Sequence, residues 1–299
     1  MAPSRAILIT GTSSGTGLSS GTGKETALRL HRAGWPVYAT ARDPERLGDL
    51  AAEGIQTMHL DLTDEQSMET VVKRINEEHG SVGVLINNAA YSLNGTFGET
   101  PMDDVRRQFE TNVFGTARLT QLVLPAMREQ GAGRIIMMSS IFGMFATPGR
   151  GYYQATKFAL EAISDSLRNE VRPFGIKVVV IQPSPIRGGF VPTTVDDLGM
   201  TDGQADGLYS GFWEFFVQWH GAYREIENPR GRGKTAVRAE KVAEVIERAV
   251  NAKNPRIRYR IGVPVRLLPR QRAIFGERAW DRFVRFFFPI PEKGQPFES

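Results

Sequence analysis

A tyrosine, a lysine and a serine lie at a spacing that suits proton transfer. Lys157 follows Tyr153 by four residues, and Ser140 precedes the tyrosine by thirteen. Because residues i and i+4 of a helix share one face, the phenol and the ammonium are expected to point the same way. A free phenol titrates near ~10, and a neighbouring ammonium favours the phenolate and so lowers its pKa. With a serine hydroxyl to hold a substrate oxygen, the pair suits proton delivery to a carbonyl while a hydride arrives from elsewhere.

The same residues also have an interpretation without chemistry. A tyrosine four residues before a lysine is common by chance, and Tyr152 beside Tyr153 makes a pair that is typical of aromatic packing. The elements that would position these side chains therefore decide between the two interpretations.

The composition is that of an ordinary globular chain, and it excludes several kinds of site. The 299 residues are 41% hydrophobic and 23% charged, enough for one large α/β domain or two small ones. The lack of cysteine excludes disulfides and thiolate catalysis, and the four histidines lack the spacing of metal ligands, so no metal site is expected. No signal peptide and no apolar run of ~18 residues are apparent, which predicts a cytoplasmic protein.

Strand and helix patterns alternate along the chain. Apolar runs predict strands at residues 5–10, 36–41, 56–61, 82–87, 134–139, 177–182 and 256–261. Helices are predicted at residues 24–33, 64–79, 102–115, 116–130 and 153–172. This alternation predicts an α/β fold with right-handed βαβ units and a parallel sheet covered by helices.

Ligands of such sheets bind at the carboxyl ends of the strands. Four conspicuous residues fall at those ends, after the first, fourth, fifth and sixth predicted strands: Gly11, Asn87, Ser140 and Pro183. Their convergence predicts a binding site at this edge of the sheet.

A glycine-rich loop follows the first predicted strand, and its pattern occurs twice. Gly11, Gly15 and Gly17 form one copy, and a six-residue duplication adds Gly21 and Gly23 before the helix at 24–33. Such a loop lets backbone amides approach a pyrophosphate at a helix N-terminus, although a flexible turn has a similar composition. Absorbing the duplication would lengthen the helix by ~9 Å and bury two glycines in it at about 1 kcal/mol each.

We therefore expect the surplus residues to bulge as a loop. The cofactor would then meet Gly11 of the first copy with Gly21 and Gly23 of the second, and the competing register uses Gly11, Gly15 and Gly17.

The order and spacing of these motifs resemble the short-chain dehydrogenases and reductases, in their short single-domain branch. The resemblance covers residues 5–190 well and 235–262 loosely. Each motif is modest, whereas their joint order and spacing are specific. They are Thr10-Gly11-x-x-x-Gly15-x-Gly17, Asp61-Leu62, Asn87-Asn88-Ala89-Ala90, Asn112, Ser140, Tyr153-x-x-x-Lys157 and Pro183-Ser184-Pro185-Ile186.

The resemblance implies a Rossmann-type doubly wound parallel sheet of about seven strands with helices on both faces, and hydride transfer with a nicotinamide nucleotide. Tyr153 would be the acid/base, Lys157 would lower its pKa and hold the nicotinamide ribose, Ser140 would bind the substrate oxygen, and Asn112 would support a proton relay through a water. Cofactor contacts would come from the glycine loop with Ser13 and Ser14, and from Asp61, Leu62, Asn88, Ala89, Ala90, Tyr153, Lys157, Pro183, Ser184 and Ile186.

Three features depart from the family pattern. The duplication alters the pyrophosphate loop, and Ala90 stands where the family usually has glycine. Ser184 replaces a glycine, and Gly188 replaces a threonine that usually contacts the carboxamide. These departures motivate an alternative function, that of a catalytically silent, cofactor-sensing or membrane-associated binding protein.

The end of the second predicted strand bears on the choice of cofactor. Ala41 stands where a carboxylate would select NAD, and Arg42 follows it. A guanidinium suits a 2′-phosphate, so we predict NADP(H) rather than NAD(H), with Arg42 as the reader. The alternative is a solvated Arg42 whose charge is reduced by Asp43.

The second half of the chain departs most from a common pattern. Residues 188–235 stand in the place of the family's substrate lid and carry aromatic residues at helical spacing: Phe212, Phe215, Phe216, Trp219 and Tyr223. They suit either the wall of a pocket for a lipophilic substrate, such as a steroid, retinoid or acyl ketone, or a lid core or subunit contact.

Nine arginines between residues 256 and 285 accompany the aromatic residues of the C-terminus. A solvated helix face explains them better than a nucleic-acid site, and no nucleic-acid partner is expected. We expect one domain over residues 1–262 and an extension, 263–299, that packs on it or lies at a membrane surface. The resemblance also implies a homo-oligomer, a dimer or tetramer, through the helices at 102–130 and 153–172.

Overall fold

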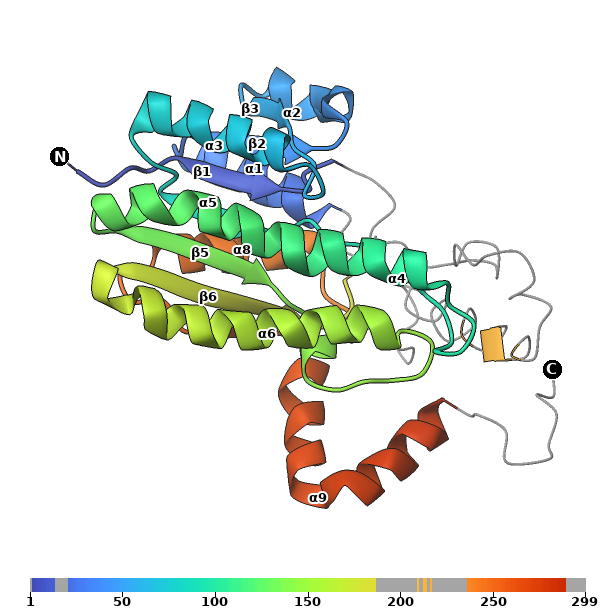
Figure 1. Ribbon diagram of the computed structural model, residues 1–299. Coiled ribbons are helices and arrows are strands. Elements are labelled where there is room, and N and C mark those ends of the chain that lie inside the picture. The colour runs from blue at the N-terminus through green and yellow to red at the C-terminus, as the bar shows by residue number, and fades with distance from the viewer. Residues whose placement is uncertain are drawn as a thin grey trace.

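The computed structural model describes residues 2–13, 21–186, 209, 212–213, 216 and 236–288. Its centre is one parallel sheet with the strand order β3-β2-β1-β4-β5-β6-β7 (Figure 1). The strands are β1 Ile7–Thr10, β2 Val37–Ala41, β3 Gln56–His59, β4 Val84–Asn87, β5 Gly133–Met138, β6 Ile176–Pro183 and β7 Arg258–Ile261.

The strand order reverses in the middle of the sheet. β1 pairs with β2 on one side and with β4 on the other. A crevice for ligands is typical of the carboxyl ends of the strands at such a switch point. The fold thus places Gly11, just after β1, beside Ala89 in the segment after β4.

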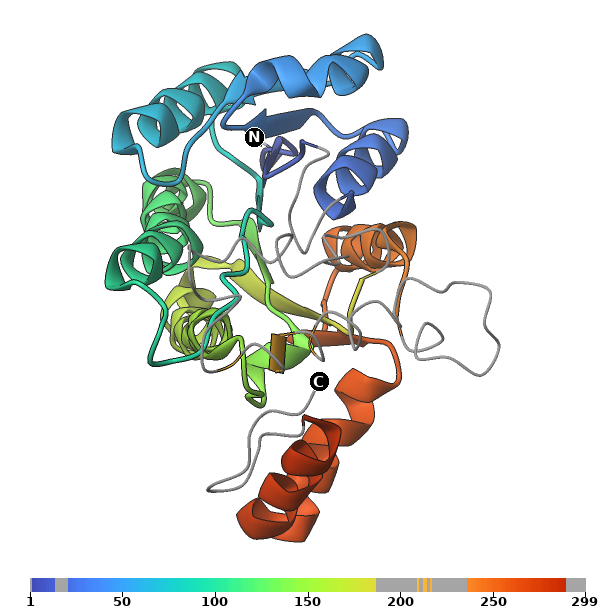
Figure 2. The same cartoon turned by 90° about the vertical axis from the view of Figure 1, so that its right-hand side faces the viewer.

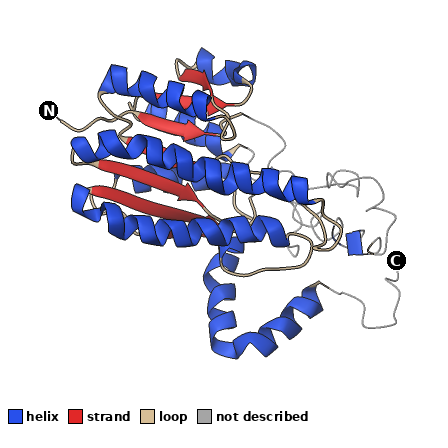
Figure 3. Cartoon of the chain, in the orientation of Figure 1, coloured by secondary structure: helices blue, strands red, loops and turns tan. Residues whose placement is uncertain are grey.

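Helices cover both faces of the sheet, as Figure 3 shows. One apolar core joins the sheet to α1 Thr22–Arg32, α2 Gly48–Ala52 and α8 Ala239–Asn251. A second core joins the opposite face to α3 Glu65–His79, α5 Thr116–Glu129 and α6 Gly151–Val171. The shorter elements are η1 Pro44–Leu47, α4 Met102–Phe109, η2 Glu110–Gly115, η3 Ile141–Gly143 and η4 Arg172–Phe174.

All seven predicted strands and the doubly wound sheet are confirmed, and several element boundaries are corrected. The third strand ends at His59, so that Asp61 and Leu62 follow it rather than belong to it. The helix predicted at 102–115 changes at Glu110 to a π-helical turn, η2. α2, α8 and the C-terminal helix were not predicted.

The C-terminal helix, α9 Pro264–Phe287, projects from the body in Figures 1 and 2 and is bent at Gly276, which has φ 75° and ψ 174°. Val265 and Trp280 of α9 are buried against Ile141 and Phe145, just after β5. The extension therefore packs on the segment that follows Ser140. In the part of the chain that the structure describes, no helix has the length and apolarity to cross a membrane.

Candidate active site

The glycines on either side of the loop after β1 lie against backbone. Gly11 has φ 69°, and a Cβ atom there would stand 2.7 Å from the Cα of Ala89. A Cβ at Gly23 would stand 2.4 Å from the carbonyl oxygen of Gly11 and 2.7 Å from Nδ2 of Asn88. Gly21, with φ 88°, is the N-cap of α1, which begins at Thr22. These contacts leave no room for side chains at positions 11 and 23.

The expected pairing of Gly11 with Gly21 and Gly23 thus matches the start of α1. Ser13 follows Gly11 closely and is partly buried. The competing register cannot be compared, because Ser14, Gly15 and Gly17 lie outside the described residues.

Asn88 connects the segment after β4 to the end of β1. Its Nδ2 donates to the carbonyl oxygens of Thr10 and Gly11, both at 2.9 Å. The Oγ1 of Thr10 accepts from the backbone amides of Asn88 and Ala89, both at 3.0 Å. Ala90 follows, partly exposed. Neutral hydrogen bonds therefore join the ends of β1 and β4 beside Gly11.

Tyr153 and Ser140 come together in a buried place at the end of β5. Tyr153 is 6% exposed, and the Ser140 hydroxyl lies near enough to its phenol to affect the pKa of Tyr153. The same hydroxyl accepts from the amide of Phe142 at 3.2 Å. The ring of Phe142 lies edge-on to that of Tyr153, with centroids 6.5 Å apart. Tyr152, in contrast, stacks on Phe97 and donates to its carbonyl oxygen. Of the two tyrosines, Tyr153 alone lies beside Ser140.

The prediction that Lys157 lowers the pKa of Tyr153 is wrong. Burial raises that pKa to about 12, because the phenolate loses its hydration, while the Arg150 charge and the Ser140 hydrogen bond oppose the rise. Nζ of Lys157 lies 5.7 Å from the centre of the Tyr153 ring and donates instead to the carbonyl oxygen of Met138 at 2.8 Å. The phenol is accordingly a protonated group at neutral pH.

Lys157 is itself perturbed by burial. Its pKa is lowered to about 8 by desolvation, and the charge of Glu161 opposes this fall. The ammonium thus keeps its proton at neutral pH only by a small margin, and its charge depends on its neighbours.

Asn112 is fully buried in the π-helical turn η2. Its Nδ2 donates to the carbonyl oxygen of Tyr91 at 2.9 Å and to Oγ1 of Thr156 at 3.2 Å, and its Oδ1 accepts from the amide of Tyr91. Thr156 in turn donates to the carbonyl oxygen of Tyr153 at 2.7 Å. The side chain therefore fixes the segment after β4 against the turn of α6 that carries the tyrosine.

Arg42 lies at the end of β2, next to the glycine loop. It is exposed, and among the described residues it forms no ion pair, whereas Asp43 pairs with Arg46 at 3.3 Å. Its charge acts on Tyr91, whose pKa is raised mainly by burial and lowered slightly by nearby arginines. Among the described residues, the ion-pair partner of Asp43 is therefore Arg46 rather than Arg42.

The remaining expected cofactor residues fall into two groups. Asp61 accepts from the amide and hydroxyl of Thr63, and Leu62 is buried beneath Gly115. Pro183 ends β6 and pairs with Ile261, Ser184 accepts from the amide of Val265, and Ile186 forms a bridge with Val237. The hydroxyl of Ser184 thus holds the first turn of α9.

Three described aromatic residues of the expected lid form a packed cluster. Phe212, Trp213 and Phe216 are at most 2% exposed, and their ring centroids lie 4.9 to 5.8 Å apart. A Cβ atom on Gly149 would stand about 3 Å from Phe212 and Phe216, so the cluster packs directly before α6. Phe215, Trp219, Tyr223 and Gly188 lie outside the described residues.

Comparisons with known proteins agree with this geometry. Residues 5–198 match the family model described as short chain dehydrogenase. The chain belongs to the short-chain dehydrogenase family.

Relatives and solved structures extend the match to most of the chain. A 3-ketodihydrosphingosine reductase of Bacteroides thetaiotaomicron is 32% identical over 277 residues, which are 92% of this chain and 97% of that protein. Retinol dehydrogenase 5 of Mus musculus is 30% identical over 92% of this chain and 88% of its own. The crystal structure of a short-chain dehydrogenase from Streptomyces avermitilis has a TM-score of 0.72 and 30% identity, and covers 96% of this chain and 99% of its own. The protein is thus an NAD(P)-dependent oxidoreductase.

Two charged groups near Tyr153 and Lys157 were not predicted from the sequence. Arg150 is 4% exposed, donates to Oδ1 of Asn94 at 2.9 Å and lies 5.1 Å from the ring centre of Phe216. Glu161 lies one helical turn after Lys157 and pairs with Arg258 of β7 at 3.0 Å. The only signal in the sequence was position, three residues before Tyr153 and four after Lys157.

Proposed function

We propose that this dehydrogenase interconverts a carbonyl and a secondary alcohol with NADP(H), with Tyr153 as the acid/base. The observation that carries the proposal is the burial of Tyr153 beside the Ser140 hydroxyl, with Lys157 one turn away. Burial keeps the phenol protonated, which suits proton donation to a carbonyl oxygen.

Each residue then has a distinct role. Ser140 holds the substrate oxygen, Tyr153 moves its proton, and Lys157 holds the ribose and supplies positive charge. Bound NADP(H) supplies or accepts the hydride. Asn112 keeps the turn of α6 that contains Tyr153 in place through Thr156.

Arg42 supports the choice of NADP(H) over NAD(H). Its guanidinium has no ion-pair partner among the residues that the structure describes, and β2 ends in Ala41 rather than in an acidic residue. The guanidinium is suited to bind the 2′-phosphate bidentately. Cofactor contacts are further proposed for the glycine loop, for Asp61 and for the segment after β4.

Apolar surroundings and two relatives support a lipophilic substrate. The ring of Phe142 lies edge-on to that of Tyr153 and 5.8 Å from that of Phe145, which lies 5.1 Å from Trp280 of α9. An aromatic row thus leads from Tyr153 to the extension. The relatives whose printed names are 3-ketodihydrosphingosine reductase and retinol dehydrogenase suggest acyl ketones and retinoids as first substrates to test.

The test is NADPH oxidation with a panel of ketosteroids, retinals and acyl ketones. Tyr153→Phe is expected to lose at least ~100-fold in kcat, because it removes the proton donor. Tyr152→Phe is the matched control, since that phenol points to Phe97, and it is expected to keep most of the rate. Equal rates for Tyr153→Phe and the natural chain would refute the assignment, and no turnover by either would favour a catalytically silent protein.

The outer side of α9 supports contact with an anionic membrane surface as part of this proposal. Ile274 and Phe275, 76% and 66% exposed, lie directly before the kink at Gly276. Six arginines and only two acidic residues lie along Pro264–Phe287. An apolar tip between basic residues fits the headgroup region of an anionic bilayer.

Vesicle sedimentation tests this contact. Vesicles that contain phosphatidylglycerol are expected to retain the natural chain, and Ile274→Ser with Phe275→Ser is expected to release it. Equal binding to purely zwitterionic vesicles, or no binding to either kind, would contradict the proposal.

A homo-oligomer through η2 and α6 also belongs to the proposal. Phe114 of η2 and Phe158 of α6 are 57% and 41% exposed, and such aromatic side chains are typical of subunit contacts. Light scattering would give the mass in solution, and a monomer at all concentrations would contradict this part.

A further inference from the structure

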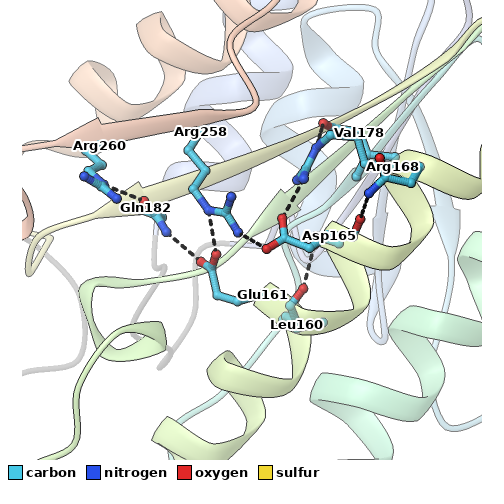
Figure 4. Close-up of polar contacts among 10 residues, drawn as sticks. Leu160, Glu161, Asp165, Arg168, Val178, Gln182, Arg258 and Arg260 are labelled. Carbon is cyan, nitrogen blue, oxygen red and sulfur yellow. Dashed lines mark hydrogen bonds and ion pairs between the residues drawn. The ribbon is translucent and has the colours of Figure 1, made fainter. Parts of the chain in front are cut away.

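A polar network joins α6 to β6 and β7, the last two strands of the sheet (Figure 4). Its centre is the carboxylate of Glu161, of which the side chain is only 12% exposed. Nε2 of Gln182 donates to one oxygen at 2.9 Å, and Nε of Arg258 donates to the other at 3.0 Å. Both carboxylate oxygens are therefore held by neighbouring strands.

A second layer holds the partners of Glu161. Arg258 also donates to Asp165 at 2.7 Å, and Asp165 accepts from Arg168 at 2.5 Å. Arg260 donates to the side-chain oxygen of Gln182 at 3.2 Å. The guanidinium of Arg258 thus lies between two carboxylates, and its positive charge is balanced within the network.

The network adjoins the buried lysine of the active site. Glu161 follows Lys157 by four residues, so both side chains lie on one face of α6. The segment after Ser140 crosses α6 at the same place, where a Cβ atom on Gly143 would stand 3.0 Å from Cγ of Glu161 and 3.2 Å from the carbonyl oxygen of Lys157. Glu161 and the lysine are therefore enclosed together.

We propose that Glu161 is a positioning residue, whose carboxylate, fixed by Gln182 and Arg258, keeps the buried Lys157 ammonium charged and in place. Through Arg258 the charge state of the active site is then coupled to β7, the strand from which α9 continues. This inference rests on the proposed role of Lys157. It gives a role to Glu161, Gln182 and Arg258, which belong to none of the sequence motifs.

The charged groups around Lys157 support this role. In the described part of the chain, α6 contributes Tyr153 and Glu161, β7 contributes Arg258 and Arg260, and Arg150 precedes α6. β5, β6 and η3 face the lysine with uncharged residues, such as Met138 and Gln182. Burial lowers the pKa of Lys157 to about 8, and Glu161 is the group whose charge opposes that fall. Without this carboxylate, the remaining charges would favour the neutral amine.

The titration of Lys157 can be followed without any substrate. The chain has eight lysines, few enough to resolve by NMR after labelling with ¹³C-lysine, and Lys157→Met assigns the signal. We expect one lysine to titrate with a midpoint of about pH 8. Glu161→Gln is expected to lower that midpoint by at least ~0.5 pH units. Because no turnover is needed, this result stands or falls separately from the proposed activity.

Two further variants distinguish positioning from simple stabilisation. Asp165→Asn removes the other carboxylate of Arg258, one turn further from Lys157, and is expected to leave the midpoint unchanged even where it lowers the melting temperature. Gln182→Met keeps the Glu161 charge but releases one of its oxygens, and is expected to shift the midpoint down by a smaller amount. It also serves if Glu161→Gln does not fold.

The proposal is overturned by either of two results. One is that Lys157 titrates at the same midpoint in Glu161→Gln as in the natural chain. Where Glu161→Gln does not fold, the same comparison is made with Gln182→Met. The other is an equal shift in Asp165→Asn, which would make the effect a general consequence of a loosened network.

Discussion

The two halves of the ligand edge of the sheet are built from different interactions. At the ends of β1 and β4, close backbone contacts and neutral hydrogen bonds dominate, with Gly23 against Gly11 and Asn88 donating to two carbonyl oxygens. At the ends of β5 and β6, charged side chains are largely buried: Lys157 is 3% exposed and Arg150 is 4% exposed.

This difference predicts different sensitivities. Around Gly11 and Gly23 there is no room for added atoms, so this half should respond to changes of shape. The half that surrounds Tyr153 depends on charges with little hydration, so it should respond to pH and to the loss of a charge. Each variant below tests one side of the comparison.

The largest effect is expected from Gly23→Ala. Its methyl group would meet the carbonyl oxygen of Gly11 at 2.4 Å, so α1 must move away from the loop that it helps to form. We expect NADPH affinity to fall at least ~100-fold, or about 2.7 kcal/mol, as measured by calorimetry. Gly48→Ala is the matched control, because no atom lies within 4 Å of that position and its φ is −52°.

An alanine at position 23 that binds NADPH as the natural chain does would contradict the close-packed description of this half. Deleting residues 18–23 sharpens the test further. The deletion brings Gly15 and Gly17 to the places of Gly21 and Gly23 in the sequence, and it is expected to keep the affinity within about tenfold.

The second effect concerns pH and the other half. Burial lowers the pKa of Lys157 to about 8, whereas that of Tyr153 is raised to about 12. Lys157 is charged below its pKa and loses its proton above it, while the phenol stays protonated. Carbonyl reduction should therefore be fully active below about 8 and then fall by about tenfold per pH unit in kcat/KM.

Lys157→Arg provides the control for this fall in activity at alkaline pH. A guanidinium stays charged throughout the range, so whatever activity the variant keeps should be independent of pH up to the region where Tyr153 titrates. If both proteins lost activity over the same alkaline pH range, that loss would have to be assigned to a group other than Lys157.

A third, smaller effect is expected from Arg42→Gln. Charge-assisted hydrogen bonds contribute about 1.5–3 kcal/mol, and an exposed site is at the lower end, so NADPH affinity should fall about tenfold. NADH affinity should not change. Arg46→Gln is the control, because Arg46 pairs with Asp43 and is similarly exposed. Equal losses for NADPH and NADH would show that Arg42 does not read the 2′-phosphate.

Most of the fold could be predicted from the sequence, because buried parallel strands leave uninterrupted apolar runs. The missed α8 is amphipathic, with Val242, Val245, Ile246 and Ala249 buried in the core. Its pattern is regular enough to have been recognised. α9 is different, since Pro269 and Gly276 interrupt it and its few buried residues, Val265 and Trp280, are far apart. Its position depends on contacts with residues distant in sequence, among them Phe145 and Ser184.

In the candidate site, too, local features could be predicted from the sequence and contacts between distant residues could not. The spacing of Tyr153 and Lys157 was sufficient to predict that they share one face, because that depends on the helix alone. The sign of the pKa shift of Tyr153 could not be predicted, since it depends on burial by residues distant in sequence and on Arg150. Nor could the Glu161 network, in which β7 lies 97 residues away.

The smallest effect is expected from Arg150→Met, and it tests whether charge rather than shape governs the half around Tyr153. Methionine keeps much of the apolar stem but removes the charge that favours the phenolate, so the pKa of Tyr153 should rise further and kcat should fall about threefold. NADPH affinity, set on the other side of the crevice, should not change. Arg150→Lys keeps the charge and should recover most of the rate, and Asn94→Ala removes the acceptor of the Nε hydrogen bond while the charge of Arg150 stays. If Asn94→Ala were as slow as Arg150→Met, the position of the side chain rather than its charge would be decisive, and the contrast between the two halves would lose its electrostatic basis.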